Sequence, residues 1–398
     1  MPTESTFILA SIFIILAATG WALGYFGERD DQPPLNIDYL KGLNFLLNEQ
    51  TDQAVEHFLK MVRVDNTTIE THFALGNLFR KRGEVNRAIR IHQNIIARPD
   101  ISDEQRDQAF YSLAKDYHHA GLLDRAEVLF RRLSVGSLFQ TQSLYSLTQI
   151  YEIEGEWEKC INCAEKLAKV TRKSFDLQIS HYFCELAEIA VASGDVKKCL
   201  EFISSTKKLK IMTLRTDLVK AKCEKLRRRY TNAIKIYRDI IQKSTYLITE
   251  ALPELVDLHK QLTTLDELNE FIKKLSQSNQ KLSRDIGYTV IINNINGISS
   301  LDDCVNSYIE NDSILKEFLD IPHDKKDMLR IETISMDKIK RSLSKLARST
   351  PRYQCESCGF SSQKLLWLCP SCKQWETQRP FSNVQFDSIL QRMPLISD

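Results

Sequence analysis

Glycine and proline are scarce in this sequence, which holds 13 and 10 of them among 398 residues. A chain with so few of both favours helices over a sheet-rich fold. A strong charge of one sign is also missing, because 54 basic and 52 acidic residues leave a net charge of +2. Without a global positive field, the composition gives no support to nucleic-acid binding.

The short motifs that mark common active sites are also missing. The sequence contains no P-loop, no GxSxG, no HExxH and no glycine-rich dinucleotide turn. Paired carboxylates occur only at the spacing of the helical repeats described below. We therefore predict that the protein is not an enzyme.

The ten cysteines form no regular disulfide framework, and six of them are scattered through helical-looking sequence. We interpret these six as reduced thiols, which indicates a cytosolic environment. Two of them have CxxC spacing but lie on one predicted helix, so we favour packed helical thiols there over a second metal or redox site. The six are Cys160, Cys163, Cys184, Cys199, Cys223 and Cys304.

The other four cysteines form two CxxC pairs near the C-terminus, Cys355 with Cys358 and Cys369 with Cys372. Because a CxxC segment folds back on itself, its two sulfurs can face one centre, and two such pairs can hold one tetrahedral metal ion. We favour this interpretation over two disulfides or four unrelated cysteines. A site of four sulfurs suits zinc and also iron, so the metal stays open. With every ligand supplied by the protein, we expect a structural or redox-sensing site.

Residues next to the cysteines support a small metal-stapled module. Gly359 follows the first pair and suits a positive φ angle, whereas Lys373 holds the matching place after the second pair and departs from that pattern. A segment this short needs a metal and a few aromatic side chains to be stable. The aromatic residues around the cysteines are Tyr353, Phe360, Trp367 and Trp375.

A period of 34 residues runs through the middle of the chain. Gly42 and Phe45 are followed 34 residues later by Gly76 and Phe79, and the frame continues with small and aromatic residues at later positions. This period is the signature of tetratricopeptide repeats, in which small residues lie where two helices cross. We predict an all-α fold with a helical solenoid of about eight units over residues 36–310, the later units being degenerate.

The N-terminus carries an uncharged run from Phe7 to Phe26, long enough to span a bilayer as a helix. We predict a transmembrane anchor over residues 1–27 and a linker over 28–35. A cleaved signal peptide is less favoured because residues 1–6 contain no Lys or Arg. Gly20 and Gly24 form a GxxxG pair at which a partner helix, including that of a second copy, would pack. The short neutral tail places the bulk of the chain on the cytoplasmic side.

Beyond the solenoid we predict further helices over residues 311–350, a metal domain over 351–385 and a tail over 386–398. An open solenoid end would expose apolar surface, so we expect the metal domain to pack on the last repeats and cap them. The remaining concave face would hold a bound protein.

Together, these features resemble the lipopolysaccharide assembly protein B family of Gram-negative bacteria. The resemblance is most specific in YQCESCGF, LWLCPSC and WET, which contain the four cysteines and begin at Tyr353. It implies a rubredoxin-like metal domain whose ligands, to iron or zinc, are Cys355, Cys358, Cys369 and Cys372.

The resemblance also implies an inner-membrane adaptor. In that family, the adaptor helps a membrane AAA+ protease degrade the deacetylase that commits the cell to lipid A synthesis. It contacts an inner-membrane lipopolysaccharide sensor through its transmembrane region and gathers lipopolysaccharide assembly enzymes. Two alternatives stay open on the residues alone: a membrane-tethered scaffold whose zinc ribbon binds nucleic acid, and an iron redox carrier.

Overall fold

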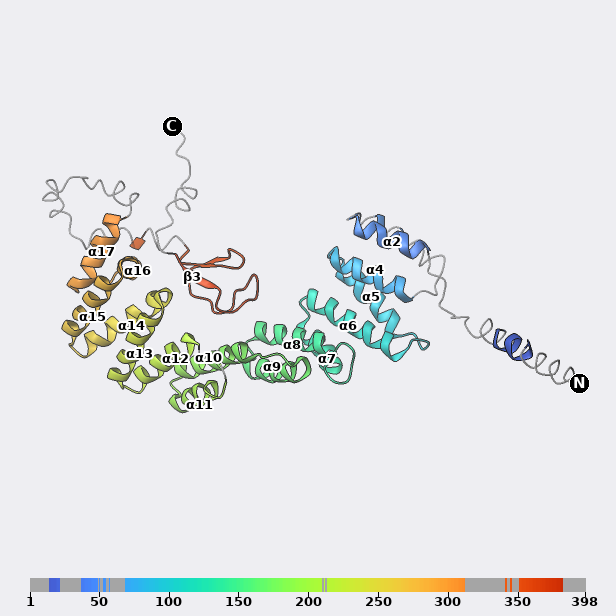
Figure 1. Ribbon diagram of the computed structural model, residues 1–398, viewed down its shortest axis with the longest axis horizontal. Helices are drawn as coiled ribbons and strands as arrows, with labels where there is room; N and C mark the ends of the chain where they lie inside the picture. The colour runs from blue at the N-terminus through green and yellow to red at the C-terminus, as the bar shows by residue number, and fades with distance from the viewer. Residues whose placement is uncertain are drawn as a thin grey trace, which may run out of the picture. The chain divides into compact units, whose positions relative to one another are not determined.

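The computed structural model describes residues 14–21, 37–48, 50, 53–54, 57, 69–209, 211, 213–311, 341, 344–345 and 351–381. Two compact units divide the chain, Met1–Ser143 and Leu144–Asp398. The described parts of both units are helical except for a three-stranded ribbon at the end of the second (Figure 1). The fold is thus an all-α tetratricopeptide solenoid with a small C-terminal metal-ribbon domain, as the repeat period and the cysteine spacing predict.

The first unit contains two complete helical hairpins, each built around small residues of the repeat. Gly76 lies so close to the ring of His92 that an added Cβ would come within 2.6 Å of Nε2. Ala88 of α5 and Ala126 of α7 are fully buried. Close contact between paired helices therefore depends on these positions being small. The helices are α2 (Ile37–Leu47), α4 (Ile69–Lys81), α5 (Val85–Ile96), α6 (Asp103–His119) and α7 (Leu123–Leu133).

The second unit continues the hairpins, and the first helices of neighbouring pairs also pack on each other, α10 on α12 and α14 on α16. Helix α8 (Gln140–Glu154) begins before the junction of the two units. The helices that follow are α9 (Trp157–Thr171), α10 (Asp176–Ala192), α11 (Val196–Thr206), α12 (Leu214–Leu226), α13 (Tyr230–Lys243), α14 (Ile248–Gln261), α15 (Leu265–Ser278), α16 (Gln280–Asn293) and α17 (Ser299–Asn311), with a 3₁₀ turn η1 (Thr245–Leu247) before α14.

The last helical pair is the most closely packed. A Cβ on Gly287 of α16 would lie 2.4 Å from the carbonyl oxygen of Cys304 and 2.8 Å from Cβ of Tyr308, both on α17. Cys304 and Tyr308 are each about 1% exposed. The repeat pattern has decayed in sequence here, but the small residue at the helix crossing remains.

The C-terminal ribbon has three short antiparallel strands in the order β2-β1-β3. Strand β1 (Tyr353–Cys355) pairs with β2 (Ser361–Ser362), Tyr353 lying opposite Ser362. It also pairs with β3 (Gln378–Pro380), Cys355 lying opposite Gln378. A single bridge joins Leu368 to Trp375. Each CxxC pair lies in a turn between these paired segments.

Several predicted segments lie partly or wholly outside the described residues. Of the expected anchor over 1–27, residues 14–21 are described and are helical, and Gly24 is not among them. Within the described ranges, no helix has both the length and the apolar character needed to cross a membrane. The linker 28–35 and the tail 386–398 lie outside the described residues, as does most of 311–350.

Candidate metal centre and its docking on the solenoid

The structure brings the four predicted ligand sulfurs together. All four Sγ atoms of Cys355, Cys358, Cys369 and Cys372 lie within 4.8 Å of one another. The Sγ atoms of Cys355 and Cys372 are 3.7 Å apart, and those of Cys358 and Cys369 are 3.6 Å apart. A tetrahedral ion with metal–sulfur bonds of about 2.3 Å requires sulfurs about 3.8 Å apart. The cluster therefore fits one tetrahedral metal ion, and its thiolate ligands suit zinc or iron.

The two cysteine turns have the same backbone shape. The N–H of Gly359 donates to the carbonyl of Cys355 at 2.9 Å, and the N–H of Lys373 donates to the carbonyl of Cys369 at 2.9 Å. Gly359 has φ +75° and Lys373 has φ +57°. Lys373 thus departs from the expected glycine in residue type but not in conformation. A left-handed conformation at a residue with a Cβ costs about 1 kcal/mol.

Hydrogen bonds around the cysteines favour the thiolate form that binds metal. The hydroxyl of Thr377 lies 3.2 Å from Cys355 Sγ, and together with the N–H groups of Cys358 and Ser357 it lowers the pKa of Cys355 to about 6. The N–H of Phe360 likewise lowers the pKa of Cys358. These hydrogen bonds therefore favour the thiolate form of Cys355 and Cys358 over their protonated form.

Exposure of the four cysteines is uneven. Cys355 and Cys369 are about 1% and 0% exposed, Cys372 is intermediate and Cys358 is exposed. One edge of the centre thus faces solvent. Since four protein sulfurs complete a tetrahedral shell, no position is left for a substrate, and the arrangement is typical of structural sites.

Aromatic side chains attach the ribbon to α10. The His181 ring is fully buried and stacks on Trp375, with centroids 4.5 Å apart and planes at 12°. Tyr182 meets the same indole edge-on at 5.6 Å. His181 Nε2 also lies 3.3 Å from Glu376 Oε1, in contact range although the two groups are not aligned as a hydrogen bond. Burial lowers the pKa of His181, and proximity of that ring lowers the pKa of Glu376.

A buried arginine attaches the ribbon to α12. Arg215 is about 1% exposed and donates to Glu185 at 2.7 Å and to Glu188 at 2.8 Å, both on α10. The face of Trp367 covers its guanidinium at 5.2 Å. These contacts form a cation–π and ion-pair junction between two helices and the ribbon.

Polar contacts continue the attachment to α14 and α16. The Tyr353 hydroxyl donates to Glu250 of α14 at 2.5 Å, and burial raises the pKa of this tyrosine. The guanidinium of Arg379 lies 4.5 Å from the ring centre of Tyr246 in η1. Arg352 reaches the carbonyl of Ile292 in α16 at 3.5 Å. The ribbon therefore contacts the first helices of four successive pairs, which are α10, α12, α14 and α16. We call the surface that these four helices present to the ribbon the docking face.

The ribbon packs on the last repeats, as expected from the sequence, but its contacts extend further than a terminal cap would. The contacts begin at α10, three helical pairs before the last pair, and run along the docking face instead of covering only the end of the solenoid. Side chains on the docking face hydrogen-bond and stack with the ribbon, which explains why it lies there. The ribbon itself thus covers part of the solenoid surface along α10 to α16.

Four docking-face residues that sequence reasoning missed occupy equivalent positions in successive repeats. His181, Arg215, Glu250 and Asp285 lie 34, 35 and 35 residues apart, one on each of α10, α12, α14 and α16. Asp285 lines a cavity of about 370 Å³ together with Glu356 and Arg379 of the ribbon. These polar residues at one repeat position are visible in the sequence, but only the structure shows that they meet the ribbon.

The six scattered cysteines are all buried in helices. Burial raises the pKa of Cys160, raises that of Cys184 to about 11, and raises that of Cys199 to about 12. Such thiols are protonated and unreactive at neutral pH. This agrees with the interpretation of Cys160 and Cys163 as packed helical thiols.

Comparison with known proteins gives matches along almost the whole chain. Residues 353–380 match the rubredoxin metal binding domain family, and residues 71–104 match a tetratricopeptide repeat family. Lipopolysaccharide assembly protein B of Escherichia coli strain K12 is 32% identical over 383 residues, covering 94% of this chain and 98% of that protein. The protein of the same name from Haemophilus influenzae is 30% identical over 391 residues, with the same coverage.

Solved structures resemble the chain more loosely. The crystal structure of a tetratricopeptide repeat protein from Parabacteroides merdae is 14% identical, covers 71% of this chain and 96% of that one, and has a TM-score of 0.31.

Proposed function

This chain belongs to the lipopolysaccharide assembly protein B family, and from that premise we propose that it is an inner-membrane adaptor controlling lipopolysaccharide synthesis. Its client is the deacetylase that commits the cell to lipid A, and it presents this client to a membrane AAA+ protease. It also gathers lipopolysaccharide assembly enzymes. These roles are non-catalytic and suit a repeat solenoid, which offers extended surface for protein partners.

The attachment of the metal ribbon to the docking face is the observation that carries this proposal. Trp375, Trp367 and Tyr353 are all engaged with solenoid helices, so the ribbon is part of one binding scaffold. Neither electron transfer nor nucleic-acid binding by an independent ribbon would require these contacts with the solenoid. The four cysteines would hold one iron or zinc ion, which supplies rigidity to the ribbon by joining its two turns.

The uncharged run from Phe7 to Phe26 supports a single-pass anchor with the remainder of the chain on the cytoplasmic side. Confinement to the membrane raises the effective concentration of the adaptor beside a membrane protease. Gly20 and Gly24 provide a face at which a helix of the inner-membrane lipopolysaccharide sensor, or of a second copy, would pack.

Depletion of the protein in its native host, followed by measurement of the deacetylase half-life, tests the adaptor role. We expect the half-life to lengthen clearly and to be restored by the wild-type chain. A Cys355→Ser, Cys358→Ser double variant removes two metal ligands, and we expect it to restore the half-life poorly. An unchanged half-life after depletion would refute the adaptor function and leave a scaffold of another pathway.

Metal analysis of the purified chain separates the remaining alternatives. A tetrathiolate iron site has visible absorption that changes on reduction, whereas a zinc site is colourless. Reversible bleaching coupled to electron transfer to a partner protein would favour the redox carrier over the adaptor. Salt-dependent retention on RNA or DNA would favour the nucleic-acid ribbon.

A further inference from the structure

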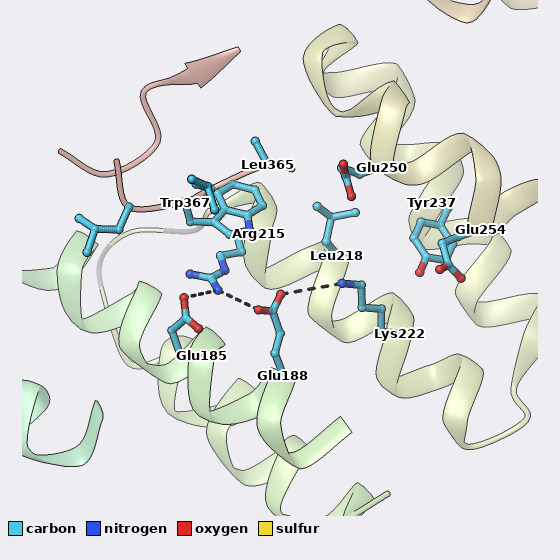
Figure 2. A pocket seen from close by; sticks show the side chains of 12 residues that line it. Glu185, Glu188, Arg215, Leu218, Lys222, Tyr237, Glu250, Glu254, Leu365 and Trp367 are labelled. Carbon is cyan, nitrogen blue, oxygen red and sulfur yellow. Dashed lines mark hydrogen bonds and ion pairs between the residues drawn. The ribbon is translucent and has the colours of Figure 1, made fainter. Parts of the chain in front are cut away.

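A cavity of about 420 Å³ lies between the ribbon and the docking face (Figure 2). The ribbon supplies the wall from Leu365 to Leu368, and α10, α12, α13 and α14 supply the remainder. This volume is within the range of natural ligand sites. None of the metal ligands lines the cavity, so it is separate from the metal centre.

Carboxylates outnumber cations around this cavity. Four glutamates line it: Glu185, Glu188, Glu250 and Glu254. Arg215 pairs with two of them, and Lys222 Nζ is 3.9 Å from Glu188 (Figure 2). Lys225, just outside the lining, is 2.6 Å from Glu254. Four carboxylates against these three cations leave one surplus negative charge, so the cavity has the electrostatics to accept one further cation.

An unpartnered hydroxyl provides a second and independent sign of a ligand. Tyr237 of α13 is fully buried and lines the cavity, yet its hydroxyl has no hydrogen-bond partner among the described residues. Figure 2 shows this hydroxyl and the Glu254 carboxylate directed to the same side. A buried polar group without a partner is unfavourable by about 1–3 kcal/mol, which a ligand hydrogen bond would recover. Burial and the nearby Glu254 raise the pKa of Tyr237, so the phenol stays protonated.

Part of the cavity wall is apolar. Leu218 of α12 and Leu365 and Trp367 of the ribbon line the cavity together with the four glutamates. Lysine and arginine combine an apolar stem with a charged head, so either would place its stem along this wall and its head among the glutamates. A polyamine is less suited, because its several positive charges would outnumber the single surplus negative charge of the cavity.

We propose that this cavity binds one lysine or arginine side chain of a protein partner. The partner's cationic head lies between Glu250 and Glu254, within reach of the Tyr237 hydroxyl, and its stem packs on Trp367. Because the wall includes Leu365–Leu368, the site exists only while the ribbon is docked. The identification of this partner as the deacetylase client rests on the adaptor role proposed above. The binding of a lysine or arginine side chain in the cavity does not depend on that role.

Fluorescence anisotropy with the full chain in detergent tests this site. The probes are fluorescein-labelled Ala-Leu-Xaa-Leu-Ala peptides in which Xaa is lysine, arginine, norleucine, citrulline or glutamate. We expect the lysine or arginine peptide to bind at least about tenfold more tightly than the uncharged ones, the usual weight of a charged hydrogen bond. Equal binding of the charged and uncharged peptides would overturn the proposal.

Two variants connect binding to the cavity. Glu254→Gln removes one carboxylate and should weaken the cationic peptide about tenfold, while Tyr237→Phe removes only the hydroxyl and should weaken it about two- to tenfold. Matched controls are Glu201→Gln on the exposed side of α11 and Tyr145→Phe on α8, neither of which lines the cavity. Equal affinity in the two cavity variants and the two controls would place the peptide elsewhere and overturn the proposal.

Competition distinguishes a protein side chain from a free amine. If the dissociation constant of n-butylammonium, measured by displacement of the lysine peptide, equals that of the peptide itself, the cavity takes a small amine and the protein-partner proposal fails. Weak displacement supports a peptide ligand. Deacetylase half-life in cells carrying Glu254→Gln tests separately whether the client supplies this side chain, and we expect that half-life to lengthen. Tight peptide binding with no effect of depletion on that half-life would refute the adaptor role while leaving this site intact.

Discussion

Removing the ring of His181 should release the ribbon from the docking face while leaving the ribbon itself intact. His181→Ala deletes the stack on Trp375 at 4.5 Å and the tilted contact with Trp367 at 6.0 Å. Each aromatic pair contributes about 0.5–1.5 kcal/mol beyond simple burial. The cavity left by a fully buried ring adds about 1 kcal/mol. The docked state should therefore lose about 2–4 kcal/mol, which lowers the docked-to-released ratio roughly 30- to 1,000-fold.

Urea titration with two probes measures this release. Circular dichroism reports the solenoid helices. Tryptophan fluorescence, measured in a Trp21→Phe, Trp157→Phe background, reports Trp367 and Trp375, which both leave their contacts when the ribbon detaches. We expect the fluorescence transition of His181→Ala to move to lower urea than the helical transition. His259→Ala is the matched control, because His259 is also fully buried but bonds Thr264 within its own helical hairpin. In that variant both transitions should move together.

Coincident transitions in His181→Ala would refute this reasoning. They would mean that the ring contacts contribute little and that the ribbon and solenoid unfold as one cooperative unit for other reasons.

Three further predictions concern pH, backbone strain and helix packing. Burial lowers the pKa of His181 below 6.5 in the docked form, so on acidification the released form binds a proton before the docked form does. Docking should therefore be strongest above about pH 6.5 and should weaken as the pH falls toward the pKa of the docked form. Fluorescence at pH 7.5 and 5.5 checks this, and an equally large acid effect in His181→Gln would contradict it. Lys373→Gly should stabilise the ribbon by up to about 1 kcal/mol, because glycine adopts a φ of +57° without the steric cost of a Cβ. The measurement is the rate of metal loss to a chelator, which should fall. Faster metal loss would show that Lys373 is not strained. Gly287→Ala should destabilise the second unit by about 1–3 kcal/mol, because the Cβ of the new alanine would clash with the carbonyl oxygen of Cys304. An unchanged melting temperature would contradict this, since it would mean that α17 moves aside with no loss of stability.

The metal ligands and the helical hairpins were predictable because their signals are local. Cys355 and Cys358 are three residues apart, so the turn between them alone directs both sulfurs to one centre. Gly76 and Ala88 report a helix crossing within a single hairpin. Lys373 shows the limit of such rules, since hydrogen bonds within its turn impose a conformation that its residue type disfavours.

The docking of the ribbon was not predictable in the same way. Tyr353 bonds Glu250 across 103 residues of chain, and His181 meets Trp375 across a still longer stretch. The repeated polar position from His181 to Asp285 is visible in sequence, but a polar residue at one repeat position is equally compatible with a solvated helix face. Only the burial of His181 and Arg215 distinguishes the two cases.

The all-α repeat architecture and the four cysteines of the metal centre follow from the sequence alone, because periodicity and short spacing act through neighbouring residues. Tertiary structure alone decided that the ribbon lies along α10 to α16 and encloses an acidic cavity with an unpartnered Tyr237 hydroxyl. Both features depend on which side chains meet across 60 or more residues of chain, and that choice is made by packing and charge pairing in the folded chain.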